Sequence, residues 1–206
     1  MALAFVITGP SGVGKGTLIR ELRKRVPELE LSVSATTRDP RAGERDGVDY
    51  HFLSPAEFDA RVRAGKFVEH ADYSGRRYGT LRAELDRRTQ AGHPVVLEIE
   101  VQGARQLRAA LPEAIQIFIA PPDEQALRAR LEGRGSDSPE QIERRLQTSI
   151  KELAARTEFG HVVVNDRLED AVAELTAIVE DELSGARGAG TPPLQSAARH
   201  QERQRQ

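Results

Sequence analysis

The N-terminal part of the chain alternates apolar runs with a glycine-rich interruption. Residues 3–8 are apolar and rich in strand-forming residues, and they stop at a segment that holds three glycines in six positions. The next segment, 15–26, repeats leucine or valine every four residues, which predicts a helix, and a short apolar strand is predicted over 29–33. A strand, a glycine loop, a helix and a second strand form one βαβ unit, and such units build parallel sheets.

The segment from 34 to about 80 has a different texture. Its apolar stretches are short, and turn signals such as Arg45-Asp46-Gly47 and Ala64-Gly65-Lys66 separate them. These features predict a small mixed α+β lobe, inserted into the α/β frame, with short antiparallel strands and one helix over 55–63.

The alternation of strands and helices resumes after residue 80. Strands are predicted over 94–99, 115–120 and 161–164, and helices over 81–91, 102–111, 123–131, 139–157 and 168–183. Segment 132–139 interrupts this order with glycine, serine and aspartate, and we expect it to be exposed and flexible. The end of the chain is rich in Gly, Ala, Gln and Arg with little to bury, so we expect 185–206 to be a disordered tail. This basic tail could touch nucleic acid or be a solvated chain end, and we expect the latter.

Together these elements predict an α/β fold with three layers, in which helices cover both faces of a central parallel sheet. We expect one domain over 1–184. Its core comprises 1–33 and 81–183, and the inserted lobe comprises 34–80.

Composition narrows the functional classes. The 206 residues are 38% hydrophobic and 30% charged, and no apolar run approaches the roughly 20 residues that a helix needs to cross a bilayer. The chain has no cysteine, which excludes disulfides, thiolate metal sites and thiol nucleophiles, and its five histidines show no metal-ligand spacing. The net charge of −2 argues against a surface that coats nucleic acid. We therefore expect a cytoplasmic protein that binds neither membranes nor nucleic acid.

The segment Gly9-Pro10-Ser11-Gly12-Val13-Gly14-Lys15 carries the strongest chemical signal in the chain. Two glycines separated by four residues and followed by lysine match the spacing of a phosphate-binding loop. Such glycines let consecutive backbone N–H groups face a phosphate, the following helix adds its positive N-terminus, and Lys15 would reach the β- and γ-phosphates. The alternative is a glycine-rich turn with an incidental lysine. It is disfavoured because the segment lies between a predicted strand and a predicted helix.

The residue after this lysine departs from the commonest pattern. That position, usually a Ser or Thr that contacts the metal ion, is Gly16, and Thr17 follows it. Several nucleoside monophosphate kinases also have Gly-Lys-Gly-Thr, so the departure favours that branch over the GTPases. Whether Thr17 would bind a metal ion directly or through water stays open.

The inserted lobe holds a second set of candidate residues. Arg38 and Arg41, three residues apart in a turn with hydroxyl groups nearby, could bind a second phosphate. Tyr50 and the Tyr78-Gly79-Thr80 triplet could add phenol and hydroxyl donors, and Glu69 places a carboxylate among apolar neighbours. Each feature alone is more often a solvated part of a surface. Their occurrence together in one lobe is what indicates a site.

Taken together, these residues closely resemble the guanylate kinases, enzymes that phosphorylate GMP to GDP with ATP. The resemblance covers about 3–183, and it is carried by the order and spacing of Gly9-Pro10-Ser11-Gly12-Val13-Gly14-Lys15, Ser34-Ala35-Thr36-Thr37-Arg38, Gly47-Val48-Asp49-Tyr50, Tyr78-Gly79-Thr80, Leu97-Glu98-Ile99-Glu100-Val101-Gln102-Gly103-Ala104 and Gly133-Arg134-Gly135. It implies the fold of P-loop kinases, with a GMP-binding lobe at 34–80 and a helical lid over about 123–157. It also implies Mg²⁺ carried in with ATP, held mostly by phosphates and water, with Thr17 as a candidate protein ligand.

The resemblance also implies which residues bind each nucleotide. The family positions that hold the GMP phosphate correspond to Arg38, Arg41, Tyr50 and Tyr78, and those that surround the guanine correspond to Ser34, Glu69, Thr80 and Glu100, with Gly79 inside the triplet. The expected ATP-binding residues are Gly9, Pro10, Ser11, Gly12, Val13, Gly14, Lys15, Gly16, Thr17 and, through its backbone, Asn165. A carboxylate only accepts hydrogen bonds and guanine offers two adjacent donors, so Glu69 would select guanine over adenine.

Phosphoryl transfer requires that the enzyme align two nucleotides, exclude water and neutralise the charge on the moving group. The resemblance places Arg130, Arg134 and Arg145 over the phosphates when the lid closes. With Lys15 and Arg38, they make up the predicted catalytic set. Arg134 lies between two glycines, which suits an arginine delivered by a mobile segment. The alternative for each lid arginine is a solvated side chain on an amphipathic helix.

Two other functional classes stay open at this point. Scaffold domains that resemble guanylate kinases bind phosphorylated partners without catalysis, but they usually lack the intact loop and lid residues that this chain has. A kinase for another acceptor, such as a phosphorylated sugar, would keep the ATP site and change the lobe. The sequence allows either a monomer or a homodimer.

Overall fold

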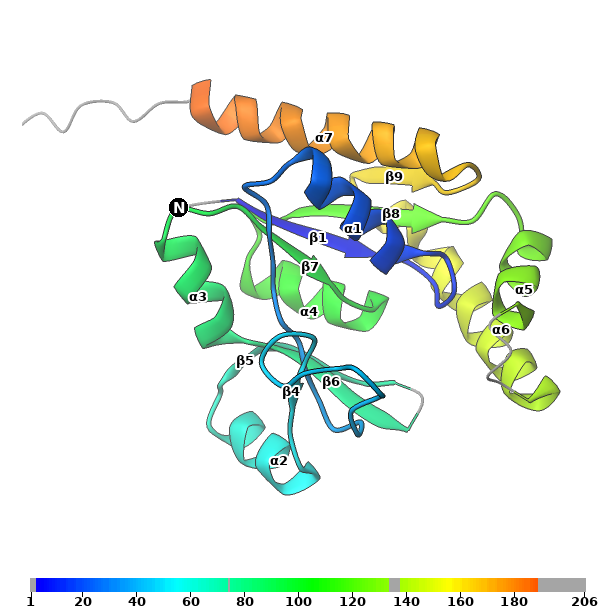
Figure 1. Ribbon diagram of the computed structural model, residues 1–206, viewed down its shortest axis with the longest axis horizontal. Coiled ribbons are helices and arrows are strands. Elements are labelled where there is room, and N and C mark those ends of the chain that lie inside the picture. Colours follow the sequence, from blue (N-terminus) through cyan, green and yellow to red (C-terminus); the bar gives the residue numbers. More distant parts are fainter. Residues whose placement is uncertain (1–2, 74, 134–137, 189–206) are drawn as a thin grey trace, which may run out of the picture.

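The computed structural model describes residues 3–73, 75–133 and 138–188 (Figure 1). Its centre is a five-stranded sheet in the order β2-β7-β1-β8-β9, in which every neighbouring pair is parallel. The strands are β1 (Ala4–Thr8), β2 (Glu30–Leu31), β7 (Val95–Glu98), β8 (Ile115–Ala120) and β9 (His161–Val164). The predicted parallel sheet is therefore confirmed, with the second strand shorter than the apolar pattern indicates.

Helices cover both faces of this sheet, as Figure 1 shows for α1 (Lys15–Arg25) and α7 (Leu168–Gly188) above it and α4 (Val101–Ala110) below it. Successive side chains of a strand point to opposite faces. In β1, Phe5 and Ile7 pack with α1 and α7 in one core cluster, whereas Val6 packs with α4 in the other. The apolar run of β1 is fully buried because both of its faces are covered. This arrangement confirms the predicted three-layer α/β class.

The inserted segment forms a second sheet in the order β4-β3-β6-β5. Its elements are β3 (Ala35–Thr36), β4 (His51–Phe52), α2 (Pro55–Arg63), β5 (Phe67–Tyr73) and β6 (Arg76–Leu81), and α3 (Arg82–Gln90) leads back to the core. We call 34–80 the acceptor lobe. The pairs β5–β6 and β3–β6 are antiparallel as predicted, but β3 and β4 pair in parallel. The long connection 37–50 returns the chain to the start of β3, so β4 runs in the same direction.

Two helices stand beyond the carboxyl ends of β1 and β8 (Figure 1). They are α5 (Glu124–Glu132) and α6 (Pro139–Ala154), and they pack through Leu127, Leu131 and Leu146. The helix predicted over 139–157 ends its α-helical part at Ala154 and continues as a 3₁₀ turn over Ala155–Glu158. Part of the segment predicted to be flexible, 134–137, lies outside the described residues.

The C-terminal helix is longer than the sequence predicts. It continues to Gly188, although the pattern predicts an end at residue 183 and a tail from residue 185. Each further turn adds a backbone hydrogen bond to a helix that has already nucleated, so small residues can extend it without burying anything. The remainder of the predicted tail, 189–206, lies outside the described residues.

Candidate active site

The glycine loop connects the carboxyl end of β1 to the first turn of α1, as the sequence predicts. Gly9 has φ +142°, and a side chain on it would begin 2.2 Å from the backbone oxygen of Ile119 in β8. Only a residue without Cβ fits there, because the loop passes directly against the neighbouring strand. Gly12 and Gly14 also have positive φ, so the loop folds back toward the N-terminus of α1.

Lys15 lies at the centre of this loop and is only 7% exposed. Its ammonium group donates to the backbone oxygen of Gly9 at 2.7 Å and lies 3.8 Å from the Glu100 carboxylate. Glu100 follows β7 and occupies the N-cap position of α4, and its Oε2 has no hydrogen-bond partner among the described residues. The lysine and this acceptor oxygen are therefore held beside each other at the carboxyl end of the sheet.

Arg130 and Asn165 fasten the loop from the side of β8 and β9. The Asn165 side-chain amide donates to the backbone oxygen of Val13 at 2.8 Å, and Arg130 donates to the backbone oxygen of Asn165 at 2.7 Å and to that of Val13 at 3.3 Å. The sequence predicts a backbone role for Asn165, and the structure shows that its side chain also supports the loop. Arg130 donates these hydrogen bonds to main-chain oxygens, and they fix the position of α5 relative to the loop.

Of the other two lid arginines, Arg145 reaches the loop directly. It projects from α6, and its Nη2 donates to the hydroxyl of Ser11 at 2.8 Å. Arg134 lies outside the described residues. Thr17 lies in the first turn of α1, and the Glu98 carboxylate lies close to Gly16, since a Cβ on this glycine would be 3.4 Å from Oε2.

In the acceptor lobe, the phosphate-binding candidates gather around Arg38. Its guanidinium group pairs with Glu44 at 2.8 Å and lies 5.2 Å from the centre of the Tyr50 ring. The Tyr50 and Tyr78 rings meet edge to face with centroids 6.3 Å apart. Burial raises the pKa of Tyr50, so its hydroxyl stays protonated and can donate. Arg41 is exposed, and its backbone N–H donates to Glu44 at 2.7 Å.

Glu69 is the buried carboxyl group of the acceptor lobe, with 4% exposure. It lies opposite Thr80 in the β5–β6 ladder, and the Thr80 hydroxyl donates to its Oε1 at 2.8 Å. Burial raises the pKa of Glu69 to about 7. Gly103 of α4 lies against the other oxygen, where a Cβ would come within 2.4 Å of Oε2. Ser34, which precedes β3, accepts the His51 backbone N–H at 2.9 Å and so lies at the start of the same sheet.

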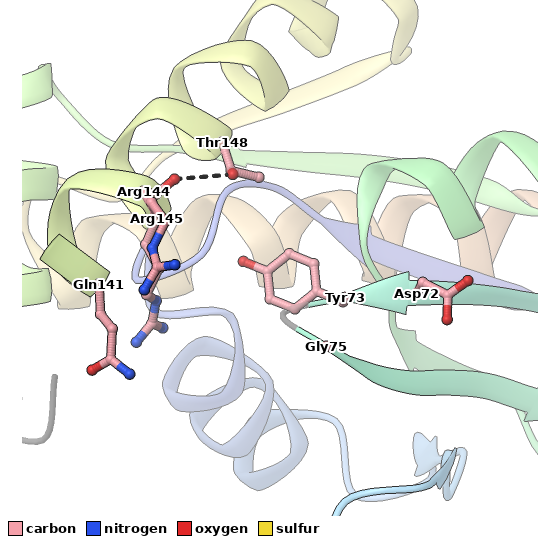
Figure 2. Close-up of a pocket in the computed structure, with 7 residues that line it drawn as sticks. All are labelled: Asp72, Tyr73, Gly75, Gln141, Arg144, Arg145 and Thr148. Atoms are coloured by element: carbon pink, nitrogen blue, oxygen red, sulfur yellow. Dashed lines mark hydrogen bonds between the residues drawn. The ribbon is translucent and has the colours of Figure 1, made fainter. Parts of the chain in front are cut away.

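A cavity of about 650 Å³ opens between the acceptor lobe and α6. It is lined by Asp72, Tyr73, Gly75, Gln141, Arg144, Arg145 and Thr148 (Figure 2). Figure 2 shows the Tyr73 hydroxyl directed from the lobe toward the arginines of α6. The cavity therefore lies between the end of β5 in the acceptor lobe and α6, whose Arg145 also contacts Ser11 of the phosphate loop.

Sequence reasoning assigned no role to Tyr73, Glu98 or Gly103, which the structure places beside the candidate site residues. Glu98 and Gly103 lie in the motif 97–104 that carries the resemblance, whereas Tyr73 has no local signal. Within 3–73, 75–133 and 138–188, no three His, Cys, Asp or Glu side chains gather as a metal site would require. None of the helices that the structure describes combines the length and apolarity needed to cross a membrane.

The fold and the site define the class of protein. A parallel sheet whose central strand runs into a glycine-lysine loop at a helix N-terminus is the framework of P-loop phosphotransferases. The acceptor lobe adds the cluster of Arg38, Tyr50 and Tyr78, which is a candidate for a second anion site.

Comparisons with known proteins identify the family. A sequence model described as "Guanylate kinase" matches residues 1–182. The chain is 55% identical over 175 residues to a guanylate kinase of Synechococcus sp. (strain CC9311), covering 85% of this chain and 92% of the relative. It is 54% identical to a guanylate kinase of Frankia casuarinae, and the match covers 84% of this chain and 95% of that relative. The crystal structure of guanylate kinase from Anaplasma phagocytophilum superposes with a TM-score of 0.72 at 29% identity, covering 88% of this chain and 86% of that one.

The chain therefore belongs to the guanylate kinase family. The predicted family and the predicted class of enzyme, a nucleoside monophosphate kinase, are confirmed by this membership.

Proposed function

We propose that this protein transfers the γ-phosphoryl group of ATP to GMP, and also to dGMP, forming ADP and GDP or dGDP. The observation that carries the choice of acceptor is the buried Glu69–Thr80 pair, whose side-chain oxygens are 2.8 Å apart, with Gly103 lying against the second carboxylate oxygen. An acceptor-only group in a buried site favours a base with two adjacent donors, which guanine has and adenine lacks. The guanine would enter here, with Ser34 and Glu100 at its edges.

The donor half of the reaction rests on the loop 9–17. Its backbone N–H groups and the N-terminus of α1 would surround the β-phosphate, and the Lys15 ammonium group would leave the Gly9 oxygen for the β- and γ-phosphates. Asn165 and Arg130 support this role because they already hold the loop at Val13. The adenine would lie beside the Asn165 backbone.

The acceptor phosphate would be bound by Arg38 and Arg41 together with the phenol groups of Tyr50 and Tyr78. Glu44 now pairs with Arg38 and would give way to, or share the guanidinium with, the phosphate. We assign charge neutralisation on the moving phosphoryl group to Arg145, which stands over Ser11, and to Arg134. Arg130 would contribute mainly by fixing the lid against the loop.

A Mg²⁺ ion that enters with ATP fits the residues that are present. Thr17 and Glu98 offer oxygen donors beside the first turn of α1, and oxygen is the ligand atom that Mg²⁺ prefers. Because these two side chains are the only protein ligands we assign, most of its ligands would be phosphate oxygens and water. When bound, the ion would neutralise part of the negative charge of the ATP phosphates.

The alternative class, a scaffold domain without catalysis, receives no support from the site. A protein that only docks partners has no need of a lysine held at the centre of a phosphate loop or an arginine laid over that loop. The expected cytoplasmic location, the absence of a nucleic-acid partner and the choice between monomer and homodimer stay predictions.

The proposal is tested by the choice of acceptor. Purified protein with ATP and Mg²⁺ is offered GMP, dGMP, AMP or ribose 5-phosphate, and ADP release is followed by a coupled assay. We expect turnover with GMP and dGMP and at least about 100-fold lower kcat/KM with AMP, because adenine leaves the Glu69 carboxylate unpaired. Equal turnover with AMP, or no ADP release with GMP from folded protein, would refute the assignment.

A further inference from the structure

Three side chains of α6 lie against one residue of the phosphate loop, Ser11. Arg145 donates to its hydroxyl at 2.8 Å, the Ser149 hydroxyl donates to its backbone oxygen at 3.4 Å, and the Glu152 carboxyl group lies near its backbone N–H. These three residues of α6 are spaced by four and three, so they lie on one face of the helix. Ser149 is fully buried, and Ser11 is 7% exposed.

The acceptor lobe reaches the same residue from the opposite side. The hydroxyl of Tyr73, at the end of β5, lies near the Ser11 hydroxyl. Figure 2 shows its ring pointing from the lobe toward the side chain of Arg145. Ser11 is therefore in contact with the lid helix and with the acceptor lobe at once, although these two parts are separated by the cleft.

The surroundings of Glu152 indicate that it does more than fill space. Its charge interacts with the charges of Lys15 and Glu100, and its Oε2 is buried without a hydrogen-bond partner among the described residues. Burial raises the pKa of Glu152 to about 7. A carboxyl group kept in such a costly place contributes an acceptor that an apolar residue could not.

We propose that Ser11 links the lid helix and the acceptor lobe to the phosphate loop and so positions the loop for phosphoryl transfer. Glu152 and Tyr73 act as positioning residues. Glu152 holds the Ser11 amide and so fixes the direction of the next N–H groups of the loop, which bind ATP phosphates. Tyr73 holds the Ser11 hydroxyl and ties the position of the acceptor lobe to that of the loop. This inference rests on the proposed function, because the loop is set for a donor nucleotide.

A purely structural role would make a different prediction. If these groups only satisfied one another in the interior, their loss would lower the midpoint of thermal unfolding and affect ATP and GMP kinetics alike. A positioning role would instead change kcat and the kinetics of one substrate. A variant that keeps the hydrogen-bond acceptor would then restore normal kinetics.

The first experiment compares Glu152→Met with Glu152→Gln, using Lys151→Met on the exposed side of α6 as the matched control. We expect Met to lower kcat/KM for ATP about 10-fold or more, while the KM for GMP changes less than about 2-fold, since a lost hydrogen bond to a positioned amide costs roughly this much. Gln, whose amide oxygen can still accept from Ser11, should recover most of the loss. Equal defects in Met and Gln, or wild-type kinetics in Met, would overturn the role of Glu152. Glu152→Ala, which removes the acceptor without adding bulk, gives the same test if the Met variant does not fold.

The second experiment is a double-mutant cycle of Tyr73→Phe and Ser11→Ala. Because both substitutions remove the same hydroxyl contact, we expect the double variant to lose no more kcat than the more affected single variant. Losses that multiply would show that the two hydroxyls act independently and would overturn the proposed link through Ser11.

The wild-type protein separates this inference from the proposed function. If the wild type releases no ADP with GMP, the proposed function fails. The affinity of the Glu152 variants for Mg²⁺-ATP, measured by titration calorimetry, then decides the inference. Affinity lowered in the Met variant and kept in the Gln variant supports it, and unchanged affinity in both opposes it.

Discussion

The two substrate sites of this protein are built in different ways. In the proposed function, the donor site is a loop whose main chain binds the phosphates, and this loop lies between a fully buried strand and a helix at the centre of the largest core cluster among the described residues. The acceptor site is a set of side chains on short strands around a small core of three buried residues, Ala35, Phe58 and Phe67. Main-chain binding requires a fixed backbone, whereas side-chain binding requires only that a few long residues converge. The large core is therefore placed under the donor and the small one under the acceptor.

This difference has a consequence for specificity. Backbone N–H groups recognise phosphate in any nucleotide, so the donor loop carries little information about the base. In the proposed function, the acceptor lobe holds one buried carboxylate to which a base would donate, and that single group would discriminate strongly between bases. The smaller and less buried part of the molecule would then carry the selectivity. The predictions below test this division, beginning with the largest effect.

The most severe loss is expected from Lys15→Met, which keeps the length of the side chain and removes its charge. We expect kcat to fall by about 10³-fold or more, because the variant loses the cation that would contact the β- and γ-phosphates. Circular dichroism and thermal unfolding should show an intact fold. The exposed Lys24→Met is the control and should retain wild-type kcat; a Lys15 variant with near wild-type kcat would refute the donor assignment.

Arg38→Ala should damage the acceptor side alone. We expect kcat/KM for GMP to fall roughly 10²- to 10³-fold, since two charge-assisted hydrogen bonds to phosphate are lost, while the KM for ATP stays within a few-fold. Arg38→Lys should recover only part of the loss, because an ammonium group cannot bind phosphate with two parallel bonds. Arg63→Ala, an exposed arginine at the end of α2, is the comparison; a matching rise in the KM for ATP would contradict the division of labour.

Glu69→Gln should lower kcat/KM for GMP by about 10²-fold, because an amide cannot accept from both guanine donors at once. The pKa of Glu69 is raised to about 7, and guanine needs the ionised form, so the affinity of the wild type for GMP should rise from pH 6 to pH 8. The GMP phosphate also ionises near pH 6, and the variant shares this contribution. Isothermal titration of both proteins should therefore show a steeper pH dependence in the wild type; parallel curves would exclude Glu69.

The same variant should be more stable than the wild type. A carboxyl group whose pKa is raised on folding binds more protons in the folded state, so its contribution to stability is full below about pH 4.5 and is lost as pH rises through about 7. Glu69→Gln should therefore raise the free energy of unfolding by on the order of 2–3 kcal/mol at pH 8 and by little at pH 4.5. Urea titrations at the two pH values measure this difference. A constant difference would mean that Glu69 is not neutral in the folded protein at low pH.

The smallest effect compares the two cores directly. Phe58→Leu in the acceptor lobe and Phe5→Leu in the central sheet both alter fully buried rings, and each should cost about 1–2 kcal/mol. Phe58 stacks on Phe67 with centroids 4.4 Å apart, so its loss should loosen the lobe and raise the KM for GMP while the KM for ATP is unchanged. Phe5→Leu should lower the midpoint of thermal unfolding without a selective change in the KM for ATP or for GMP. Identical kinetic changes in both variants would argue against two separately stabilised parts.

Much of this molecule could be predicted because the signals are local. The glycine spacing of the loop is dictated by the backbone itself, as the 2.2 Å approach at Gly9 shows, and strands such as β8 and β9 coincide with their apolar runs. The helix over 55–63 begins after Ser54, which caps it through Glu57. In each case, the physical requirement falls on residues that are neighbours in the sequence.

The tertiary structure alone decided which distant residues meet. The parallel pairing of β3 with β4 depends on the path of 37–50, and the contact of Gly103 with Glu69 depends on how α4 packs against β5. No periodicity in the chain points from Tyr73 or Glu152 to Ser11, because these contacts are fixed by the mutual positions of the lobe, the lid helix and the loop. The sequence by itself determined the elements, the loop and the family. Packing determined how the two halves of the site are joined, because long-range contacts are chosen by the shape of the whole core and not by neighbouring residues.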